Sequence, residues 1–269
     1  HSFMVLAGYS QEYNKNEYNS SNKTQLITEY APSINLATGL TFLSNDINDW
    51  AIRSLIFRGN YSYMNRYLFE INARYDGSSR FPKHSRFGIF PSSSAAWILS
   101  QESFFNPIKD WINFMKLRVS YGSLGNQNIS SYQYTENMYL GDIGMLINGE
   151  RPLGIFPPDL ISNTLTWEKV YTINGGLDFA LFENKLNISA DIYRRDTKDM
   201  LTKGRTLPNV LGTSEPKVNA ANMKTIGWEL SFNWRDKFEW LSAPFNYNIR
   251  FVLSDSRSFI TRFDNPTNY

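Results

Sequence analysis

The chain has 269 residues, with 27 Lys and Arg against 25 Asp and Glu, and its formal charge of +2 gives no electrostatic reason to expect nucleic acid as a partner. It contains no cysteine, which excludes disulfides, thiolate metal sites and cysteine nucleophiles. Its 42% hydrophobic content argues against disorder, and its 16% aromatic content is typical of membrane interfaces or sugar-binding surfaces.

Neither a spanning helix nor a signal peptide is found in the sequence. No run of about eighteen apolar residues exists, which excludes a transmembrane helix. The opening "HSFMVLAGYS" lacks the basic flank and apolar core of an export signal. We therefore expect that a signal has been removed or that the sequence is an internal fragment of a longer chain.

Alternation of apolar and polar residues predicts about nine strands, beginning with one at 3–13. A long polar segment, 14–50, is predicted to be a loop. Residues 52–63 and 67–76 then form a hairpin, because only a tight turn at 64–66 separates them. On the second strand of this hairpin the apolar positions are strictly alternate: Tyr67, Phe69, Ile71, Ala73 and Tyr75.

The middle of the chain continues the pattern with strands at 87–99 and 115–123, joined by a moderate connection that could hold one helical turn. Long segments at 124–165 and 202–224 are predicted to be loops, and loops of this length usually carry function. The remaining strands are expected at 166–181, 185–199, 228–234 and 245–253.

Long and short connections alternate along this predicted chain. In an antiparallel meander, successive connections lie at opposite ends of the sheet, so the long loops gather at one end. This asymmetry is typical of outer-membrane β-barrels. A soluble β-sandwich, the alternative, would have both kinds of connection at both ends and shorter strands.

The polar side of the predicted strands carries charges that a dry protein core would have to pair at a large desolvation cost. A water-filled barrel avoids that cost, so we expect these side chains to face a lumen. They are Arg58, Glu70, Arg74, Asp76, Lys116, Arg118, Asp178 and Asp191.

Signatures of enzymes and cofactors are weak. His1 and His84 are the only histidines, and "GSLGN" at 122–126 lacks the lysine and spacing of a phosphate loop. We therefore expect no catalysis, no metal and no cofactor, although sequence alone does not forbid a carboxylate pair that hydrolyses a glycoside.

Aromatic rings in the predicted loops are candidates for contact with a ligand. Such rings could stack on a sugar or a peptide, or they could simply pack the loop against its neighbours. The candidates are Trp50, Tyr132, Tyr134 and Tyr139.

Several blocks of sequence resemble the SusC/RagA-type TonB-dependent outer-membrane transporters, in the family's usual order and over nearly the whole chain. The blocks are "RYDGSSRF" (74–81), "FPSSSAAWILSQESF" (90–104), "LRVSYGSLGNQNI" (117–129), "LTWEK" (165–169), "GLDFALFENKLNISADIYRRDTKDML" (176–201) and "GWEL" (227–230).

The resemblance implies a 22-stranded barrel with an N-terminal plug, energised through the TonB complex and covered by a SusD-like surface lipoprotein. About nine strands cannot close such a barrel. We therefore expect residues 1–269 to be an incomplete all-β, antiparallel transmembrane barrel region without its plug and C-terminal closing strands. Membrane lipid would surround it in the bacterial outer membrane.

The function that this resemblance implies is import of a nutrient without covalent chemistry, with an oligosaccharide as the expected ligand. Three alternatives remain open at this point. They are a RagA-type peptide importer, a TonB-dependent receptor for a siderophore or vitamin, and a soluble carbohydrate-binding β-protein.

Overall fold

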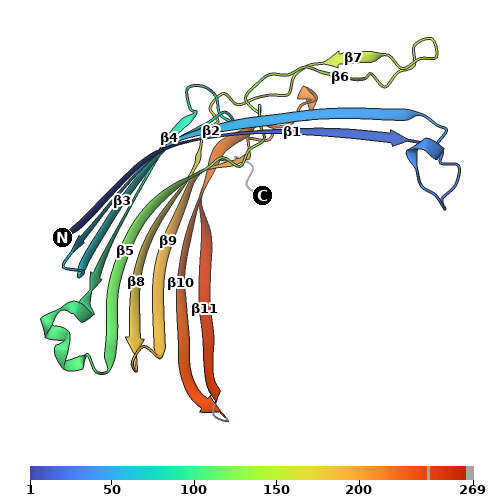
Figure 1. The fold of residues 1–269 in the computed structure, drawn as a ribbon. Helices are drawn as coiled ribbons and strands as arrows, with labels where there is room; N and C mark the ends of the chain where they lie inside the picture. Colours follow the sequence, from blue (N-terminus) through green and yellow to red (C-terminus); the bar gives the residue numbers. More distant parts are fainter. Residues whose placement is uncertain (241–242, 265–269) are drawn as a thin grey trace.

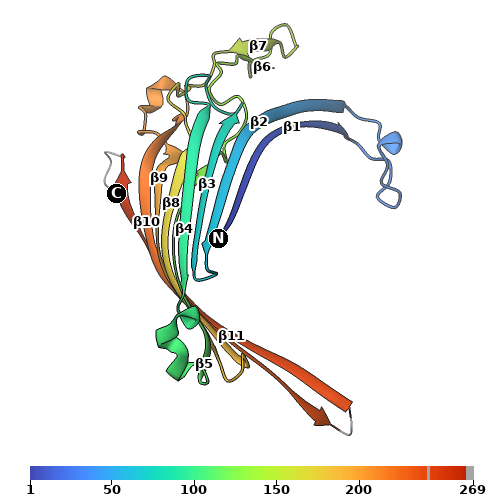
Figure 2. The same ribbon diagram turned by 60° about the vertical axis from the view of Figure 1, so that its left-hand side comes forward.

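A nine-stranded antiparallel sheet dominates the computed structural model, which describes residues 1–240 and 243–264 (Figure 1). Its order, β1-β2-β3-β4-β5-β8-β9-β10-β11, is a meander in which a separate hairpin, β6–β7, is inserted between β5 and β8. The sheet is strongly curved, as two views show (Figures 1 and 2). The strands are β1 (Ser2–Lys23), β2 (Thr41–Tyr63), β3 (Tyr67–Ser78), β4 (Phe87–Ile98), β5 (Ile112–Asn126), β6 (Tyr139–Asp142), β7 (Leu153–Phe156), β8 (Glu168–Leu181), β9 (Leu186–Lys203), β10 (Lys217–Trp240) and β11 (Ala243–Phe263).

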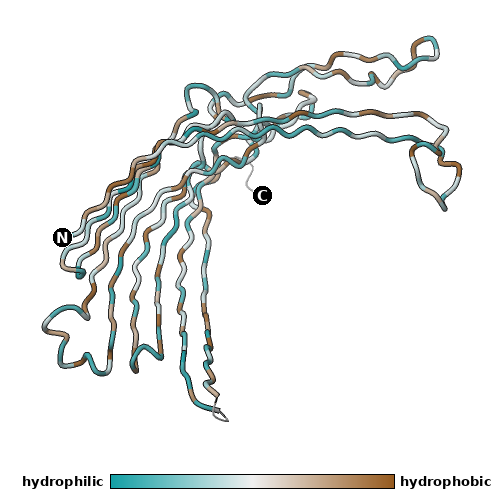
Figure 3. Tube along the Cα trace, viewed as in Figure 1, coloured by the Kyte–Doolittle hydropathy of each residue, from teal (hydrophilic) through white to brown (hydrophobic). Residues whose placement is uncertain are grey.

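The register gives the sheet two different faces, because residues directly opposite each other on neighbouring strands share a face. Hydropathy accordingly changes from residue to residue along many strands (Figure 3). One face, called here the apolar face, includes Leu55, Phe57, Phe69, Ile71, Leu117, Val119, Leu177 and Ile192. The other, the polar face, carries Arg58, Glu70, Arg74, Asp76, Lys116, Arg118, Asp178 and Asp191.

The apolar face is uncovered. Ile71 is 59% exposed, Val119 54% and Ile192 70%, although all three lie in the middle of long strands. Water-soluble proteins rarely leave an apolar surface of this extent open, so this face requires a non-aqueous environment. Within the described part of the chain, no helix is long and apolar enough to cross a membrane.

Aromatic side chains border the apolar face at both ends. Near the tight turn at 64–66, the Tyr67 and Trp97 rings stack with centroids 6.1 Å apart, and near the other end Tyr75 stacks on Phe87 at 5.1 Å. From Tyr67 to Tyr75 the strand covers about 27 Å, or about 20 Å once a tilt of roughly 40° is allowed for. This matches the aromatic girdles and the apolar band, about 25 Å tall, of outer-membrane barrels.

The two ends of the sheet differ in their connections, as predicted. At one end the described turns are short, at 64–66 and 182–185, and a longer connection holds the 3-10 helices η2 (Leu99–Gln101) and η3 (Ser103–Ile108). These helices confirm the predicted helical turn. The other end, called here the long-loop end, carries the connections 24–40, 79–86, 127–167 and 204–216, with η1 (Ile34–Leu36) and η4 (Asn209–Leu211) in the first and last of them.

The prediction of a loop over 14–50 is wrong, because β1 runs to Lys23 and β2 begins at Thr41. The two strands form a hairpin that extends well beyond the other strands (Figures 1 and 2). Side chains on this extension join across the strands, as where the Asn45 amide donates to Glu17 Oε1 at 3.2 Å. Both of its faces are mostly polar and exposed, so no alternation marks it as a strand.

The predicted loops 124–165 and 202–224 are also shorter than expected. The first contains the end of β5 and the β6–β7 hairpin, and the second loses residues to β9 and β10. The added stretches of β9 and β10 continue the main sheet at its long-loop end, and β6–β7 is a separate hairpin; in both cases the backbone pairs where the sequence predicted a loop.

A polar cluster around Glu102 ties the connection at 99–111 to the sheet. The carboxylate of Glu102 accepts hydrogen bonds from the Tyr67 hydroxyl at 2.8 Å and from the Trp97 indole at 3.1 Å. Arg66 adds an ion pair at 3.1 Å. The hydrogen bonds from Trp97 and Tyr67 are the main causes that lower the pKa of Glu102 from its ordinary value of 4.5.

This lowered pKa predicts how the cluster responds to acid. A carboxylate with a depressed folded-state pKa contributes stability that is present above its unfolded pKa and is lost as the pH falls through the folded value. Below about pH 4.5, the wild type should therefore lose thermal stability more steeply than Glu102→Gln. Melting curves of the two full-length proteins from pH 7 to pH 3 would test this; parallel slopes would contradict it.

Candidate functional site

Arg118 is the centre of an ion-pair network on the polar face. It extends from β5, and its two terminal nitrogens donate to the two carboxylate oxygens of Asp191 on β9, each at 2.6 Å. It also donates to Asp178 on β8, through Nε at 3.1 Å and Nη2 at 3.2 Å. One guanidinium therefore bridges three strands.

Further partners complete this network. Lys116 Nζ lies 3.0 Å from Asp178 Oδ2, and the Ser189 hydroxyl donates to Asp178 Oδ1 at 2.7 Å. The Asn174 amide donates to Asp191 Oδ1 at 2.9 Å. The charges are balanced and hydrogen bonded, as partly buried charges must be if they are not to destabilise the fold.

Gly176 makes this arrangement possible because it lies on β8 between Arg118 and Asp191 in the register. A Cβ at this position would lie 2.5 Å from Arg118 Cζ and 2.7 Å from Asp191 Oδ1. The guanidinium therefore passes directly over the glycine to reach the next strand.

Replacing Gly176 with Ala should displace the guanidinium and lower the free energy of unfolding by about 1–2 kcal/mol through the loss of charge-assisted hydrogen bonds. Gly175→Ala is the matched control, since a Cβ there meets only Ile192 at 3.9 Å, an ordinary contact. Chemical unfolding of the full-length protein gives the measurement. The Gly176 effect should be smaller when Arg118 is already Met, and an undiminished effect there would refute this explanation.

The other charges predicted on the polar face form smaller groups near β2 and β3. Arg58 donates to Asn72 Oδ1 at 2.7 Å and lies 3.9 Å from Glu70, and Arg74 pairs with Asp76 at 3.2 Å. The predicted polar positions are therefore clustered on one face. The β8 and β9 members join the β5 network, whereas these four acidic and basic residues form local pairs.

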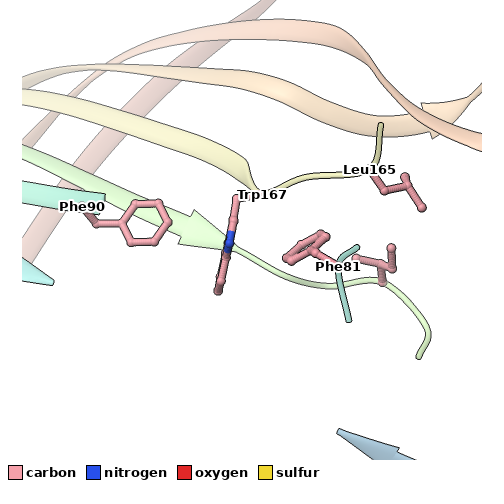
Figure 4. Close-up of a cluster of buried hydrophobic side chains, with 5 residues drawn as sticks. Phe81, Phe90, Leu165 and Trp167 are labelled. Atoms are coloured by element: carbon pink, nitrogen blue, oxygen red, sulfur yellow. The ribbon is translucent and has the colours of Figure 1, made fainter. Parts of the chain in front are cut away.

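At the long-loop end, buried apolar side chains anchor the base of the loops (Figure 4). Trp167 lies between two other rings, with centroid distances of 5.1 Å to Phe81 and 5.3 Å to Phe90. Phe90 lies on β4 beyond its last paired residue with β5, since the pairing of the two strands ends at Ser92 and Gly122. We call this group the loop-base cluster; it consists of Phe81, Phe90, Ile129, Leu165 and Trp167.

Hydrogen bonds at the loop-base cluster join the end of the 127–167 connection to two other segments, the 79–86 loop and β10. The Trp167 indole donates to the Arg86 carbonyl at 2.9 Å, and the Ser85 hydroxyl donates to the Leu165 carbonyl at 2.6 Å. The Asn219 side chain makes two 3.0 Å hydrogen bonds to the backbone of Thr166, one as donor and one as acceptor. The 127–167 loop thus emerges from a rigid base formed with the 79–86 loop and β10.

Comparison with known proteins gives the family. The sequence profile of the TonB dependent receptor-like β-barrel matches residues 2–269. The chain belongs to this family. Its members are outer-membrane barrels that act as transporters and receptors rather than enzymes. A barrel in a membrane leaves its lipid-facing side uncovered by protein, which agrees with the exposed apolar face of this sheet.

The similar proteins include TonB-dependent receptors, one of which is named SusC. TonB-dependent receptor P3 of Formosa agariphila is 32% identical over 92% of this chain and 25% of its own length. TonB-dependent receptor SusC of Bacteroides thetaiotaomicron is 27% identical over 96% of this chain and 25% of its own length. The chain therefore spans about a quarter of these relatives.

Solved structures agree on the fold. The structure of the RagAB peptide transporter superposes with a TM-score of 0.80 at 22% identity, covering 97% of this chain and 28% of that one. The outer membrane transporter YddB of Escherichia coli gives 0.55 at 14% identity, covering 95% of this chain and 30% of that one. The resemblance to the SusC/RagA type stated from the sequence is thus confirmed.

Two of the four aromatic ligand candidates, Trp50 and Tyr134, lie against the same loop segment, 79–86. Trp50 is in β2 rather than in a loop, so that part of its prediction is wrong, and the Arg80 guanidinium lies over its ring at 5.1 Å. The Tyr134 hydroxyl donates to the Ser79 carbonyl at 3.1 Å, and its ring packs on the loop-base cluster. Tyr134 therefore has a packing role at least.

The other two candidates are more open. Tyr132 is 45% exposed and has a positive φ of 62°, a conformation that L-residues adopt rarely outside turns. Tyr139 is 55% exposed on β6 and stacks on Phe156 with centroids 5.0 Å apart. These rings remain free to contact a ligand, and their role stays a prediction.

The sequence did not predict the loop-base cluster, although Phe81 lies in "RYDGSSRF" and Trp167 in "LTWEK". Phe90 and Trp167 lie within the predicted strands 87–99 and 166–181, and Phe81 lies in a predicted connection, so no local pattern in the sequence brings the three rings together. Among residues 1–240 and 243–264, no group of three His, Cys, Asp or Glu side chains is placed to hold a metal ion.

Proposed function

We propose that residues 1–269 form part of the barrel wall of an outer-membrane importer whose apolar face contacts lipid and whose polar face lines the lumen. The observation that carries this proposal is the reversal of the usual soluble pattern. Apolar side chains such as Ile71 and Val119 are exposed, while charges such as Arg58 and Arg118 lie on the opposite face, where they form ion pairs. A larger barrel, of 22 strands in the family resemblance, would complete the wall.

In this proposal the import is active and involves no covalent chemistry. A plug domain coupled to the TonB complex would open the lumen, and a SusD-like lipoprotein would cover the long-loop end. The ligand would be captured between this lid and the connections 24–40, 127–167 and 204–216, with Trp50, Tyr132 and Tyr139 as candidates for contact. The lumen charges would remain paired while ligand passes.

An oligosaccharide is the proposed cargo, supported by the exposed aromatic rings at the long-loop end, whose faces suit sugar stacking. A peptide is the second candidate. It is favoured by the similarity in fold to the RagAB peptide transporter, at a TM-score of 0.80.

Uptake by cells that express the full-length transporter would test the function and separate the two cargoes. We would supply fluorescein-labelled oligosaccharide and peptide pools of equal size and collapse the proton gradient as a control. Energy-dependent accumulation of the labelled oligosaccharides is the expected result. Uptake of peptides alone would support the second candidate, and a full-length protein recovered outside the outer membrane would refute the proposal.

A further inference from the structure

A groove of about 740 Å³ crosses β8, β9, β10 and β11. It is lined by apolar-face residues Ile173, Gly175, Ile192, Ile226 and Trp228, and by Arg194 and Arg257. The register places the lining residues in rows of cross-strand partners. One row is Ile192, Trp228 and Asp255. The next row, two residues nearer the long-loop end on each strand, is Arg194, Ile226 and Arg257.

The floor of this β8–β11 groove is open because Gly175 has no side chain. A Cβ at this position would touch only Ile192 Cγ1, at 3.9 Å, so no other described residue fills the space over Gly175. The walls are exposed apolar side chains: Ile192 is 70% exposed and Ile173 53%. A hydrocarbon chain matches this lining.

Basic residues gather on the long-loop side of the groove. Arg194 and Arg257 share one row, and Lys224 lies in the next, opposite Asp196. Arg194 pairs with Asp196 at 2.8 Å, but its side chain is still 54% exposed. Arg257 forms no ion pair with any described residue. The other acid in the groove, Asp255, lies one row nearer the middle of the apolar band.

The groove has apolar walls toward the middle of the apolar band and guanidinium groups toward the long-loop end. This combination matches an amphipathic anion. Guanidinium binds phosphate in a bidentate manner, and acyl chains fill apolar grooves on a lipid-facing surface. The outer end of the apolar band is the level at which the headgroups of the outer leaflet lie.

We propose that the β8–β11 groove binds one membrane lipid with a phosphorylated headgroup, its phosphate at Arg194 and Arg257 and an acyl chain over Gly175. This inference rests on the proposed function, because the apolar face must lie in a membrane. A bound lipid would be a fixed part of the wall beside the polar network on the opposite face.

Native mass spectrometry of the full-length transporter in detergent would test the proposal. The probe is a bis-phosphorylated, acylated glucosamine disaccharide, compared with the same lipid after removal of its phosphates. We expect the wild type to retain the phosphorylated lipid and the Arg194→Gln/Arg257→Gln variant to bind it about a hundredfold more weakly, or about tenfold for each lost charge-assisted contact. Gly175→Leu should also weaken binding, because its side chain occupies the floor.

Arg195→Gln is the matched control. Arg195 is the next residue on β9 and lies on the polar face, where its guanidinium is 5.7 Å from the Tyr193 ring. This variant should bind the lipid as the wild type does.

Equal binding of the phosphorylated and dephosphorylated lipids, or unchanged binding by the double variant, would overturn the proposal. Variants that dissociate a dimer of the transporter without changing lipid binding would instead assign the groove to contact between copies and would also overturn it. If uptake and outer-membrane location are intact in these samples, such results refute the lipid site alone and leave the proposed function standing.

Discussion

Replacing Arg118 with Met should lower the free energy of unfolding by about 2 kcal/mol. The change leaves Asp178 and Asp191 on adjacent strands without the guanidinium that bridges them, and only Lys116 and neutral donors remain. Removing one partner of a fully buried pair costs roughly 3–5 kcal/mol, and the exposure of these side chains reduces that cost. The Arg118 side chain is 30% exposed, that of Asp178 22% and that of Asp191 17%.

Chemical unfolding of the full-length protein in detergent or lipid would measure this loss. Arg58→Met is the matched control, because the Arg58 side chain is 51% exposed and its Nε lies 3.9 Å from Glu70. Exposed pairs of this kind contribute about 0–1 kcal/mol. Equal losses for the two variants would mean that the three-strand network adds nothing beyond an ordinary surface pair.

The sequence predicted those strands whose two sides face different environments. The alternation of Tyr67, Phe69 and Ile71 with polar neighbours located β3 because one side must be apolar and the other wet. The extension of β1 and β2 past the apolar band gave no such signal, since water meets both of its sides. There the strand assignment depends on cross-strand pairs such as Asn16 with Asn48, which lie far apart in the sequence.

The candidate site shows the same division between local and long-range information. Arg118, Asp178 and Asp191 were predicted to share a face, because that follows from parity along each strand. Their mutual contact was not predictable, because Arg118 and Asp191 are separated by 73 positions and meet only through the register of β5, β8 and β9. The role of Gly176 depends on the same register.

Replacing Trp167 with Ala should destabilise the loop-base cluster by about 3–5 kcal/mol, the usual cost of removing a buried aromatic side chain. Trp167 is 4% exposed, and the change would also leave the Arg86 carbonyl without the indole donor. The strands do not depend on this side chain for their backbone pairing. We therefore expect the sheet to remain folded while the 127–167 connection detaches from its base.

Limited proteolysis, read by mass spectrometry, would distinguish this local loss from global unfolding. New cleavage sites should arise within 127–166 in Trp167→Ala, while β5 and β8 remain protected. Tyr139→Ala, which removes a 55% exposed ring from the same connection, should leave the cleavage pattern of the loop base unchanged. If Trp167→Ala exposes the strands as rapidly as the loop, the cluster supports the barrel wall itself; if it exposes neither, the hydrogen bonds of Ser85 and Asn219 are sufficient to hold the loop.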